Sequence, residues 1–247
     1  MKFYLGTHQP NWLQFSSVPM FVSDVRLRRI QKLKPATCDW ALDSGGYSEL
    51  SKYGEWRTGP REYAKRARRY AQEIGRLDFA AVQDWMCEPW MLDKTGLDIQ
   101  EHQERTVNSL LNLMLLEPCV PWAPVLQGYE LDDYLRHLDW YDTRRIDLSK
   151  FKVVGVGTLC RRHATKEAII ILRAIRERTG LPLHGFGFKS TGLVNSKHIL
   201  RSADSLAWSF AARQVPPLPG HITQHRHCNN CFDYALLWRE KLMRKLQ

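Results

Sequence analysis

Short apolar runs alternate with longer amphipathic segments along most of this 247-residue chain. Two parallel strands need a crossover connection, usually a helix, so the alternation predicts a parallel sheet covered by helices. The last expected strand is weak, and no eighth strand is evident. The expected strands cover residues 2–6, 40–42, 79–82, 122–126, 153–156, 183–188 and 205–207.

Amphipathic helices are expected between these strands. Pro60 suits the first turn of a basic helix, because the amide at that position has no intrahelical partner. Gly180 suits the end of a later helix. The expected helices cover residues 23–34, 61–74, 100–116, 131–141, 165–178 and 232–245.

The strand ends favour a closed barrel over an open sheet. An open sheet gathers its ligand site at one switch point, whereas a barrel takes site residues from the ends of many strands. Almost every expected strand here ends in a polar residue or a glycine. The sequence therefore predicts an α/β fold, a TIM-like (β/α)8 barrel that is irregular near its C-terminal end. Residues 1–247 are expected to form one compact domain, which includes a small Cys/His element and a helix at residues 221–247.

Composition excludes several classes of protein. A content of 44% hydrophobic residues is too high for a disordered chain, and six cysteines are too few for a disulfide scaffold, so we expect a reducing compartment. The first residues lack the features of a signal peptide, and no apolar stretch reaches the roughly 18 residues of a spanning helix. We expect a soluble, cytoplasmic protein with no membrane partner.

The chain is basic, with 36 Lys and Arg against 26 Asp and Glu and a formal charge of +10. Such an excess attracts polyanions, and together with nine tryptophans and nine tyrosines it favours a nucleic-acid partner. The alternative is charge that only keeps helix surfaces solvated. Arg161, Arg162 and Lys189 follow expected strands and are the candidates for contacts with phosphate.

In a barrel the strand ends meet at the carboxyl-terminal rim. Carboxylates, amides and glycines at this rim indicate a pocket in which a planar, hydrogen-bonding ligand approaches the backbone closely. Tyr47, Trp85 and Phe186 are candidates for stacking on such a ligand. The alternative is that each glycine permits a turn and each aspartate caps a helix. The expected pocket residues are Asp43, Ser44, Gly45, Gly46, Asp84, Gln127, Gly128, Gly157, Gly187 and Asp204.

A Cys-x-x-Cys pair precedes the last helix. Cys228 and Cys231 have the spacing that lets two thiolates bind one tetrahedral zinc ion, which needs further ligands. His225 and His227 are the first candidates, with His221 or the distant Cys160 as alternatives. The other interpretation is two cysteines that cap a helix beside solvent-exposed histidines.

Three strand ends resemble a known family. Asp43-Ser44-Gly45-Gly46-Tyr47 is similar to the Asp-Ser-Gly-Gly-Phe signature of tRNA-guanine transglycosylases. Val125-Leu126-Gln127-Gly128 resembles their Val-Gln-Gly strand end, and Val154-Gly155-Val156-Gly157 resembles their glycine strand, in the same order. The resemblance covers roughly residues 40–210. The short length and the segments 156–162 and 184–187 are most similar to the DpdA branch, whose phage and bacterial members put 7-deazaguanines into DNA.

The resemblance implies a zinc-bearing TIM barrel that uses two aspartates. Asp43 matches the aspartate that handles protons, and Asp204 is the expected nucleophile, although a strict overlay places that position near Ala207. Gln127, Gly157 and, approximately, Asp84 match base-recognition positions. The implied zinc motif is incomplete here, because its first cysteine is missing and no histidine follows Cys231.

The resulting hypothesis is an enzyme that replaces guanine in DNA by a 7-deazaguanine, such as 7-cyano-7-deazaguanine, through a covalent aspartyl-sugar intermediate. The expected partners are double- or single-stranded DNA and the deazaguanine base; an accessory protein is compatible with the sequence. A phage-encoded chain would work in the host cytoplasm. The alternatives are the same chemistry on tRNA, a non-catalytic nucleic-acid-binding barrel and a carbohydrate hydrolase on the same fold. The length leaves no room for an appended RNA-binding domain, which counts against tRNA.

Overall fold

A computed structural model of the chain describes residues 1–246 and confirms the predicted barrel. Every strand pairing is parallel, and the order of the sheet is β5-β4-β3-β2-β1-β9-β8-β7-β6. The strands are β1 (Lys2–Thr7), β2 (Met20–Ser23), β3 (Trp40–Asp43), β4 (Leu77–Ala81), β5 (Trp122–Ala123), β6 (Val125–Leu126), β7 (Val154–Val156), β8 (Leu183–Gly185) and β9 (Ser202–Ser205).

The barrel closes at Pro124. Strand β5 pairs with β4, and β6 pairs with β7, so one short segment bridges the two ends of the sheet. Pro124 separates the two halves because it has no amide hydrogen to donate to a strand ladder. Its carbonyl still accepts from the Gly155 amide at 2.8 Å. If β5 and β6 are counted as one interrupted strand, the barrel has the eight strands of a (β/α)8 fold.

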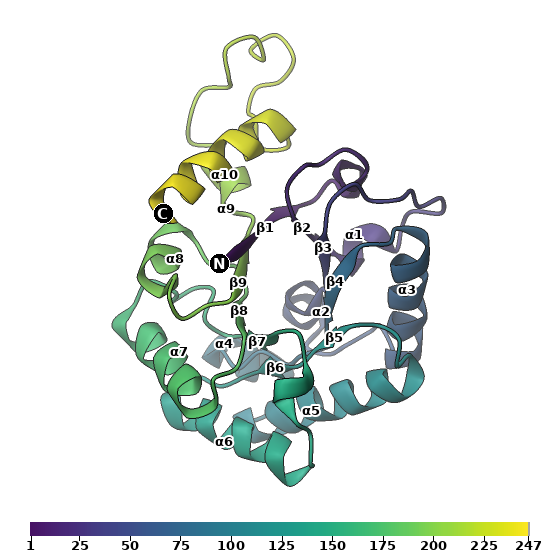
Figure 1. Cartoon of the computed structure of the whole chain (residues 1–247), viewed down its shortest axis with the longest axis vertical. Coiled ribbons are helices and arrows are strands. Elements are labelled where there is room, and N and C mark those ends of the chain that lie inside the picture. The colour runs from purple at the N-terminus through teal and green to yellow at the C-terminus, as the bar shows by residue number, and fades with distance from the viewer. Residues whose placement is uncertain (247) are drawn as a thin grey trace.

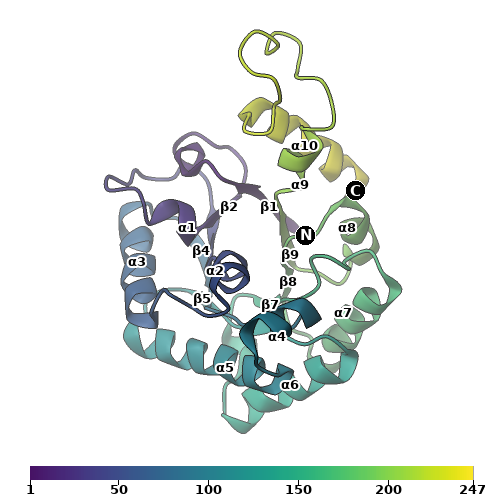
Figure 2. The same ribbon diagram turned by 180° about the vertical axis from the view of Figure 1, so that it is seen from behind.

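Helices surround the barrel (Figure 1). The long helices α3, α5, α6 and α7 form an outer ring, while α2 and α4 contact each other and lie in front of the strands in Figure 2. The helices are α1 (Asp24–Leu27), α2 (Gly46–Tyr53), α3 (Pro60–Glu73), α4 (Pro89–Thr95), α5 (Ile99–Leu116), α6 (Leu131–Thr143), α7 (Lys166–Thr179), α8 (Ser190–Ser196), α9 (Ala207–Ala211) and α10 (Phe232–Leu246), with 3-10 turns η1 (Pro10–Gln14) and η2 (Leu148–Lys150).

Strand β2 is the one strand of the eight that the sequence pattern did not predict. Its residues Met-Phe-Val-Ser form only a four-residue strand, and Ser23 was expected to cap a helix over residues 23–34. That helix was wrong beyond Leu27: Ile30 and Leu33 still pack against the core, but the chain turns after Leu27 and leads into Pro35, before which helical backbone is disfavoured. The helix shrinks to the single turn α1, which leaves Ser23 at the end of β2.

The weak last strand was misplaced. It covers Ser202–Ser205 rather than residues 205–207, and Ala207 begins α9. All four residues of β9 are buried. A strand that is buried on both faces does not show the alternation of apolar and polar residues that marks a half-exposed strand, so its position was hard to predict. The strand expected over residues 183–188 also ends earlier, at Gly185, because a turn with Gly187 at φ +65° follows.

Aromatic side chains fill the interior of the barrel. Tyr4, Phe21 and Phe79 pack around the buried imidazole of His184, with ring centroids 5.0 to 5.9 Å from it. At the amino ends of the strands, Asp78 accepts hydrogen bonds from the Tyr4 hydroxyl and from two lysines, Lys2 and Lys152. This ion cluster lies at the end of the barrel opposite the carboxyl ends of the strands and lines a cavity there.

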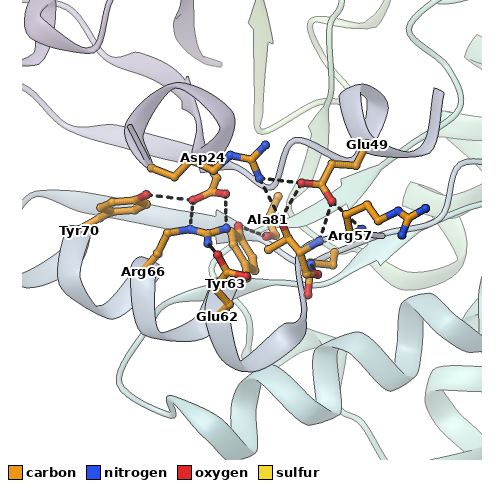
Figure 3. Close-up of polar contacts among 11 residues, drawn as sticks. Asp24, Glu49, Arg57, Glu62, Tyr63, Arg66, Tyr70 and Ala81 are labelled. Carbon is orange, nitrogen blue, oxygen red and sulfur yellow. Dashed lines mark hydrogen bonds and ion pairs between the residues drawn. The ribbon is translucent and has the colours of Figure 1, made fainter. Parts of the chain in front are cut away.

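Two further ion clusters hold the first helices to the barrel (Figure 3). Asp24, only 1% exposed, accepts two hydrogen bonds from Arg66 at 2.8 and 2.6 Å and one from Tyr70 at 3.0 Å. Glu49 accepts from Arg28 at 2.7 Å and from the Thr58 hydroxyl at 2.6 Å. These contacts fix α1 and α2 against α3, and with them the loops after β2 and β3.

Within residues 1–246, none of the helices combines the length and the apolar character needed to cross a bilayer.

Candidate functional site

A cavity of about 340 Å³ opens at the carboxyl ends of the strands. This volume falls at the small end of the range typical of ligand pockets. Aromatic and backbone surface from Phe21, Phe186 and the strand ends forms much of its wall. Four acidic side chains also line it, from the ends of β3, β4 and β9 and from the loop before α4: Asp43, Asp84, Glu88 and Asp204.

Asp43 is the last residue of β3 and faces this cavity. The Ser23 hydroxyl, at the end of the neighbouring β2, and the Gly45 amide favour the ionised form of its carboxyl group. Gly45 has φ +86°, and a Cβ atom there would lie 2.6 Å from Val25 Cγ2. A side chain at this position is therefore excluded both by the left-handed backbone and by Val25. The tight turn brings the loop back over the strand and leaves the Asp43 carboxyl group at the cavity wall.

Asp204 reaches the cavity from β9. Its Oδ1 accepts a hydrogen bond from the Gly187 amide at 3.0 Å and lies 3.3 Å from His184 Nε2. His184 Nδ1 in turn lies 2.9 Å from the Ser202 hydroxyl. Ser202, His184 and Asp204 thus form one buried chain of hydrogen bonds that orients the carboxylate. Ala207 lies beyond the strand, in α9, and does not line the cavity.

Asp84 is held by a network that spans three strand ends. Gln127 Nε2 donates to Asp84 Oδ2, and Gln127 Oε1 accepts from the Thr158 hydroxyl at 2.6 Å. That hydroxyl also accepts from the Cys87 amide at 2.8 Å. The network fixes which end of the Gln127 amide faces Asp84. Gln127 is fully buried, so it positions Asp84 and does not line the cavity itself.

The backbone beside this network is strained. Thr158 has φ +58°, a left-handed conformation that β-branched residues rarely adopt and that costs about 1–3 kcal/mol. The preceding Gly157 leaves room for Gln127, since a Cβ atom there would lie 2.2 Å from Gln127 Nε2. Both residues line the cavity. Strain of this kind is found where a site requires a particular backbone geometry.

Three acidic groups of the cavity, Asp43, Asp84 and Glu88, have raised pKa values. Burial, and then the negative charge of Asp43, raise the pKa of Asp84 to about 7. Burial, and to a smaller degree the charges of Asp204 and Asp24, raise the pKa of Asp43. Burial also raises the pKa of Glu88. Burial and a neighbouring carboxylate thus place the pKa of Asp84 in the range useful for proton transfer near neutral pH.

Not all expected pocket residues line the cavity. Asp43, Gly46, Asp84, Gly157, Gly187 and Asp204 do, whereas Ser44, Gly45, Gln127 and Gly128 lie behind it. Gly128 is needed for packing, because a Cβ atom there would lie 2.7 Å from Asp133 Cβ. Of the expected stacking residues, Tyr47 and Phe186 line the cavity, whereas Trp85 is buried against His102 at 5.3 Å.

The expected phosphate-binding residues differ in their surroundings. Arg161 is exposed, donates to the Tyr47 hydroxyl at 2.7 Å and lies over the Trp90 ring at 5.0 Å, beside the cavity mouth. Lys189 is exposed at the start of α8. Arg162 instead donates to the Tyr129 carbonyl and packs on the Tyr129 ring at 4.3 Å. Arg161 and Lys189 are thus open to a phosphate, while Arg162 holds a loop.

A second group of polar side chains lies in the loop before α10. His221, His225, Cys228 and Cys231 each place one ligand atom within 4.8 Å of the others. His225 Nε2 lies 3.1 Å from Cys228 Sγ, and His221 Nδ1 lies 3.4 Å from Cys231 Sγ. Ligands of a tetrahedral zinc ion lie about 3.3–3.8 Å apart, so this donor set suits zinc. His221 takes the place expected for His227, which is outside the group; the element expected to end at residue 247 is described to residue 246.

Three residues of the cavity and its support were missed from the sequence. Glu88 follows Cys87 in a loop, and nothing in the pattern indicates that it is buried. His184 lies inside β8, where it was expected only to be part of a strand. Thr158 follows Gly157 and was not expected in the site, although it has left-handed backbone and contacts Gln127. A histidine within an otherwise apolar, glycine-rich strand was the one signal available.

The fold and the cavity define a (β/α)8-barrel protein with an acidic ligand pocket at the carboxyl ends of its strands. The whole chain, residues 1–247, matches the family model described as "DpdA: DeoxyPurine in DNA protein A", and the chain belongs to this family of DNA deazapurine-modification proteins. The comparison with curated proteins gave no match.

Among solved structures, the chain is similar to the carboxyl transferase domain of pyruvate carboxylase from Rhizobium etli, determined with 3-hydroxypyruvate. The two share 11% sequence identity with a TM-score of 0.47, over 99% of this chain and 47% of the other. The chain thus spans about half the length of that structure.

Proposed function

We propose that the protein is a base-exchange enzyme that removes guanine from DNA and installs a 7-deazaguanine such as 7-cyano-7-deazaguanine. The observation that carries this proposal is the pair Asp43 and Asp204 in one cavity with a third carboxyl group, Asp84, held rigidly by Gln127. Exchange at an anomeric carbon needs a nucleophile, a proton donor and a surface that recognises the base. Membership of the DpdA family supports DNA as the substrate.

Asp204 is the proposed nucleophile. One of its oxygens attacks the anomeric carbon C1′ of the target nucleotide, the C1′–N9 bond breaks, and guanine leaves with the bonding electrons. In the second half, N9 of the incoming base attacks C1′ and releases the Asp204 carboxylate. The Gly187 amide and His184 support this role, because both contact Oδ1 and aim the other oxygen.

Asp43 is the proposed proton carrier. The departing guanine needs a proton, and the incoming base must lose one, so a single carboxyl group can donate in the first half and accept in the second. The raised pKa of Asp43 supports this role, since burial favours the protonated form. The negative charge of Asp204 adds to the effect and is lost when the covalent intermediate forms.

Asp84 is the proposed receptor for the Watson–Crick edge of the base. Guanine and 7-deazaguanine present the same pair of donors there, N1–H and the exocyclic amino group, which match one carboxylate. Gly157 and Gly187 let the base approach the backbone, and Phe186 and Tyr47 offer apolar surfaces for its faces. Gln127 supports the site by fixing Asp84.

The target nucleotide must leave the helical stack to enter this cavity, or it must come from a single strand. Arg161 and Lys189 are proposed to hold the phosphates beside the mouth, and the overall charge of +10 supports a polyanionic substrate. Zinc bound by His221, His225, Cys228 and Cys231 would stabilise the loop before α10. None of the four lines the cavity, so zinc would have a structural role.

The test is the incorporation of labelled bases into nucleic acid. We expect the wild-type protein to release guanine from DNA and to incorporate labelled 7-cyano-7-deazaguanine, detected by nucleoside mass spectrometry, with no incorporation into tRNA. Asp204→Asn is expected to remove the activity, whereas the exposed Asp139→Asn should retain it. Incorporation into tRNA but not DNA, or full activity in Asp204→Asn, would contradict the proposal.

A further inference from the structure

Arg26 is a cation of the cavity that the mechanism above does not use. It lies on the single turn α1, directly after β2, and is the only lysine or arginine within residues 1–246 that lines the cavity. The residue is exposed, and no acidic side chain of this range forms an ion pair with it. The nearby Arg28 differs, because it is paired with the buried Glu49. The Arg26 guanidinium is therefore available to a ligand.

The strand order places Arg26 between the two aspartates of the proposed reaction. Strands β9, β1, β2 and β3 are consecutive neighbours in the barrel; Asp204 lies on β9, and Asp43 ends β3. Ser23, the last residue of β2, is in register with Asp43, and Arg26 follows three residues later. In the loops after β1 and β2, His8 and Arg26 both line the cavity and are exposed. This arc of the wall therefore reaches the cavity mouth.

A nucleotide that reacts in the cavity brings its phosphates to the same arc. In the proposed reaction the sugar lies between Asp204 and Asp43, and the sugar carries a phosphate on its 3′ side and another on its 5′ side. Carboxylates inside the cavity repel these phosphates, so the phosphates are expected to stay at the mouth. Arg26 is the charged side chain that the chain provides there.

The chemistry of arginine suits this position. A guanidinium stays charged at every physiological pH, and its paired N–H donors fit two oxygens of one phosphate. Partial burial, and then the charges of Arg26 and Arg213, lower the pKa of His8, so its imidazole is mostly uncharged at pH 7. Arg161 and Lys189 do not line the cavity, which leaves them for phosphates farther along the strand.

Resting on the proposed function, we propose that Arg26 forms a phosphate subsite at the cavity mouth, which binds a phosphodiester next to the target nucleotide. Only one of the two substrates carries this group, because the incoming base has no phosphate. Arg26 is thus a positioning residue for DNA. It contributes to the affinity for the strand and holds C1′ between the two aspartates, but it adds nothing to the affinity for a free base.

The test combines a change in the protein with a change in the DNA. Binding of a single-stranded oligonucleotide with one guanine is measured for the wild type, Arg26→Ala, Arg26→Lys and Arg29→Ala. Arg29 is the matched control, because it is also exposed and does not line the cavity. The oligonucleotide is used unmodified and with one neutral methylphosphonate linkage, placed 5′ of the guanine, 3′ of it or remote from it. Binding of free guanine is measured by calorimetry.

We expect Arg26→Ala to weaken binding of the unmodified oligonucleotide about tenfold and to reduce the salt slope by about one, while Arg29→Ala changes the affinity about threefold or less. One of the two linkages beside the guanine, made neutral, should weaken binding to the wild type about tenfold but leave Arg26→Ala nearly unchanged, because the two changes remove the same contact. The remote linkage should affect both proteins equally. Arg26→Lys should recover part of the affinity, and all variants should bind guanine like the wild type.

Equal losses in Arg26→Ala and Arg29→Ala, additive effects at both linkages beside the guanine, or a matching loss of affinity for free guanine would overturn the subsite. Coupling between Arg26 and one linkage, in a wild type that exchanges no base, would overturn the proposed function and still support the subsite. If Arg26→Ala does not fold, Arg26→Gln removes the charge at similar length and gives the same comparison.

Discussion

The pKa values of buried carboxyl groups are shifted in opposite directions at the two ends of the barrel. At the amino ends of the strands, burial would raise the pKa of Asp78, but hydrogen bonds from Lys152, Lys2 and Tyr4 outweigh it and lower the pKa. At the carboxyl ends, burial raises the pKa of Asp43 and Asp84, and no lysine or arginine side chain of the described chain forms an ion pair with either.

The difference separates structural acids from functional ones. An acid paired with cations contributes to stability, while unpaired acids in one cavity destabilise the fold and persist where chemistry needs them. Asp24 and Glu49, both in ion pairs, follow the pattern of Asp78 although they lie near the cavity. The presence of a cation, more than burial, is therefore what distinguishes the two kinds of carboxyl group in this molecule.

The largest expected effect comes from a pair of variants that remove one acid of each kind, the unpaired Asp43 and the paired Asp24. Asp43→Asn should lower the exchange rate by about 10²–10⁴-fold, because the proton carrier is lost. Its stability at pH 7 should equal or exceed that of the wild type, since a carboxyl group with a raised pKa destabilises the fold above its unfolded pKa.

Asp24→Asn is the matched variant for Asp43→Asn. It leaves Arg66 with only the exposed Glu62 as a partner and should cost about 3–5 kcal/mol of unfolding free energy, with less than a tenfold change in rate for the folded protein. Urea unfolding and single-turnover exchange measure both quantities. A destabilised Asp43→Asn with normal activity would contradict the distinction.

A smaller effect concerns the pH dependence of base binding. Asp84 must be ionised to accept N1–H and the amino group, so affinity for 7-deazaguanine should rise through pH 7 and fall about tenfold per pH unit below it. Asp84→Asn should give a flat profile. Asp43→Asn should move the profile to lower pH, because the charge of Asp43 contributes to the raised pKa of Asp84.

The same pKa fixes the sign of the effect on stability. The folded value of about 7 lies above the ordinary value of 3.8, so the Asp84 contribution to stability is complete below about pH 4 and is lost as pH rises through 7. A base affinity that falls on raising the pH from 6 to 8 would be inconsistent with the role given to Asp84.

The smallest effect lies outside the barrel. In the cluster of His221, His225, Cys228 and Cys231 four potential ligand atoms converge, and we expect zinc to bind them. One zinc per chain is expected in purified protein, and His221→Ala should reduce it while His227→Ala should not. Chelation should lower the melting temperature by a few degrees and leave the barrel folded, which circular dichroism can follow. Full zinc content in His221→Ala would exclude the cluster.

The barrel and much of the cavity could be predicted because strand ends carry local signals. Asp43 and Asp84 each follow a recognisable β segment, whereas Asp204 stood beside a weak one, and the glycine turns indicate close approach of the backbone. Strand β2 could not be predicted, because it has only four residues, too few to show a hydrophobic periodicity, and its last residue looks like a helix cap. The position of β9 was shifted because strands buried on both faces lose the alternation on which such predictions depend.

Contacts between residues far apart in the sequence could not be predicted. Glu88 looks like a surface acid in a loop, and only the fold shows that it is buried and lines the cavity. Gln127 was expected to contact the base, yet the fold buries it behind Asp84. His221 and His227 are equally plausible ligands by spacing, and the path of the loop decides between them.

The central claim is that Asp204 forms a covalent bond to the sugar. The most direct test incubates the protein with guanine-containing DNA in the absence of a second base and examines denatured samples by gel electrophoresis and mass spectrometry. We predict an adduct of protein and abasic DNA, attached through Asp204, in the wild type and in Asp139→Asn, and none in Asp204→Asn. An adduct that persists in Asp204→Asn, or one mapped to another residue, would contradict the account.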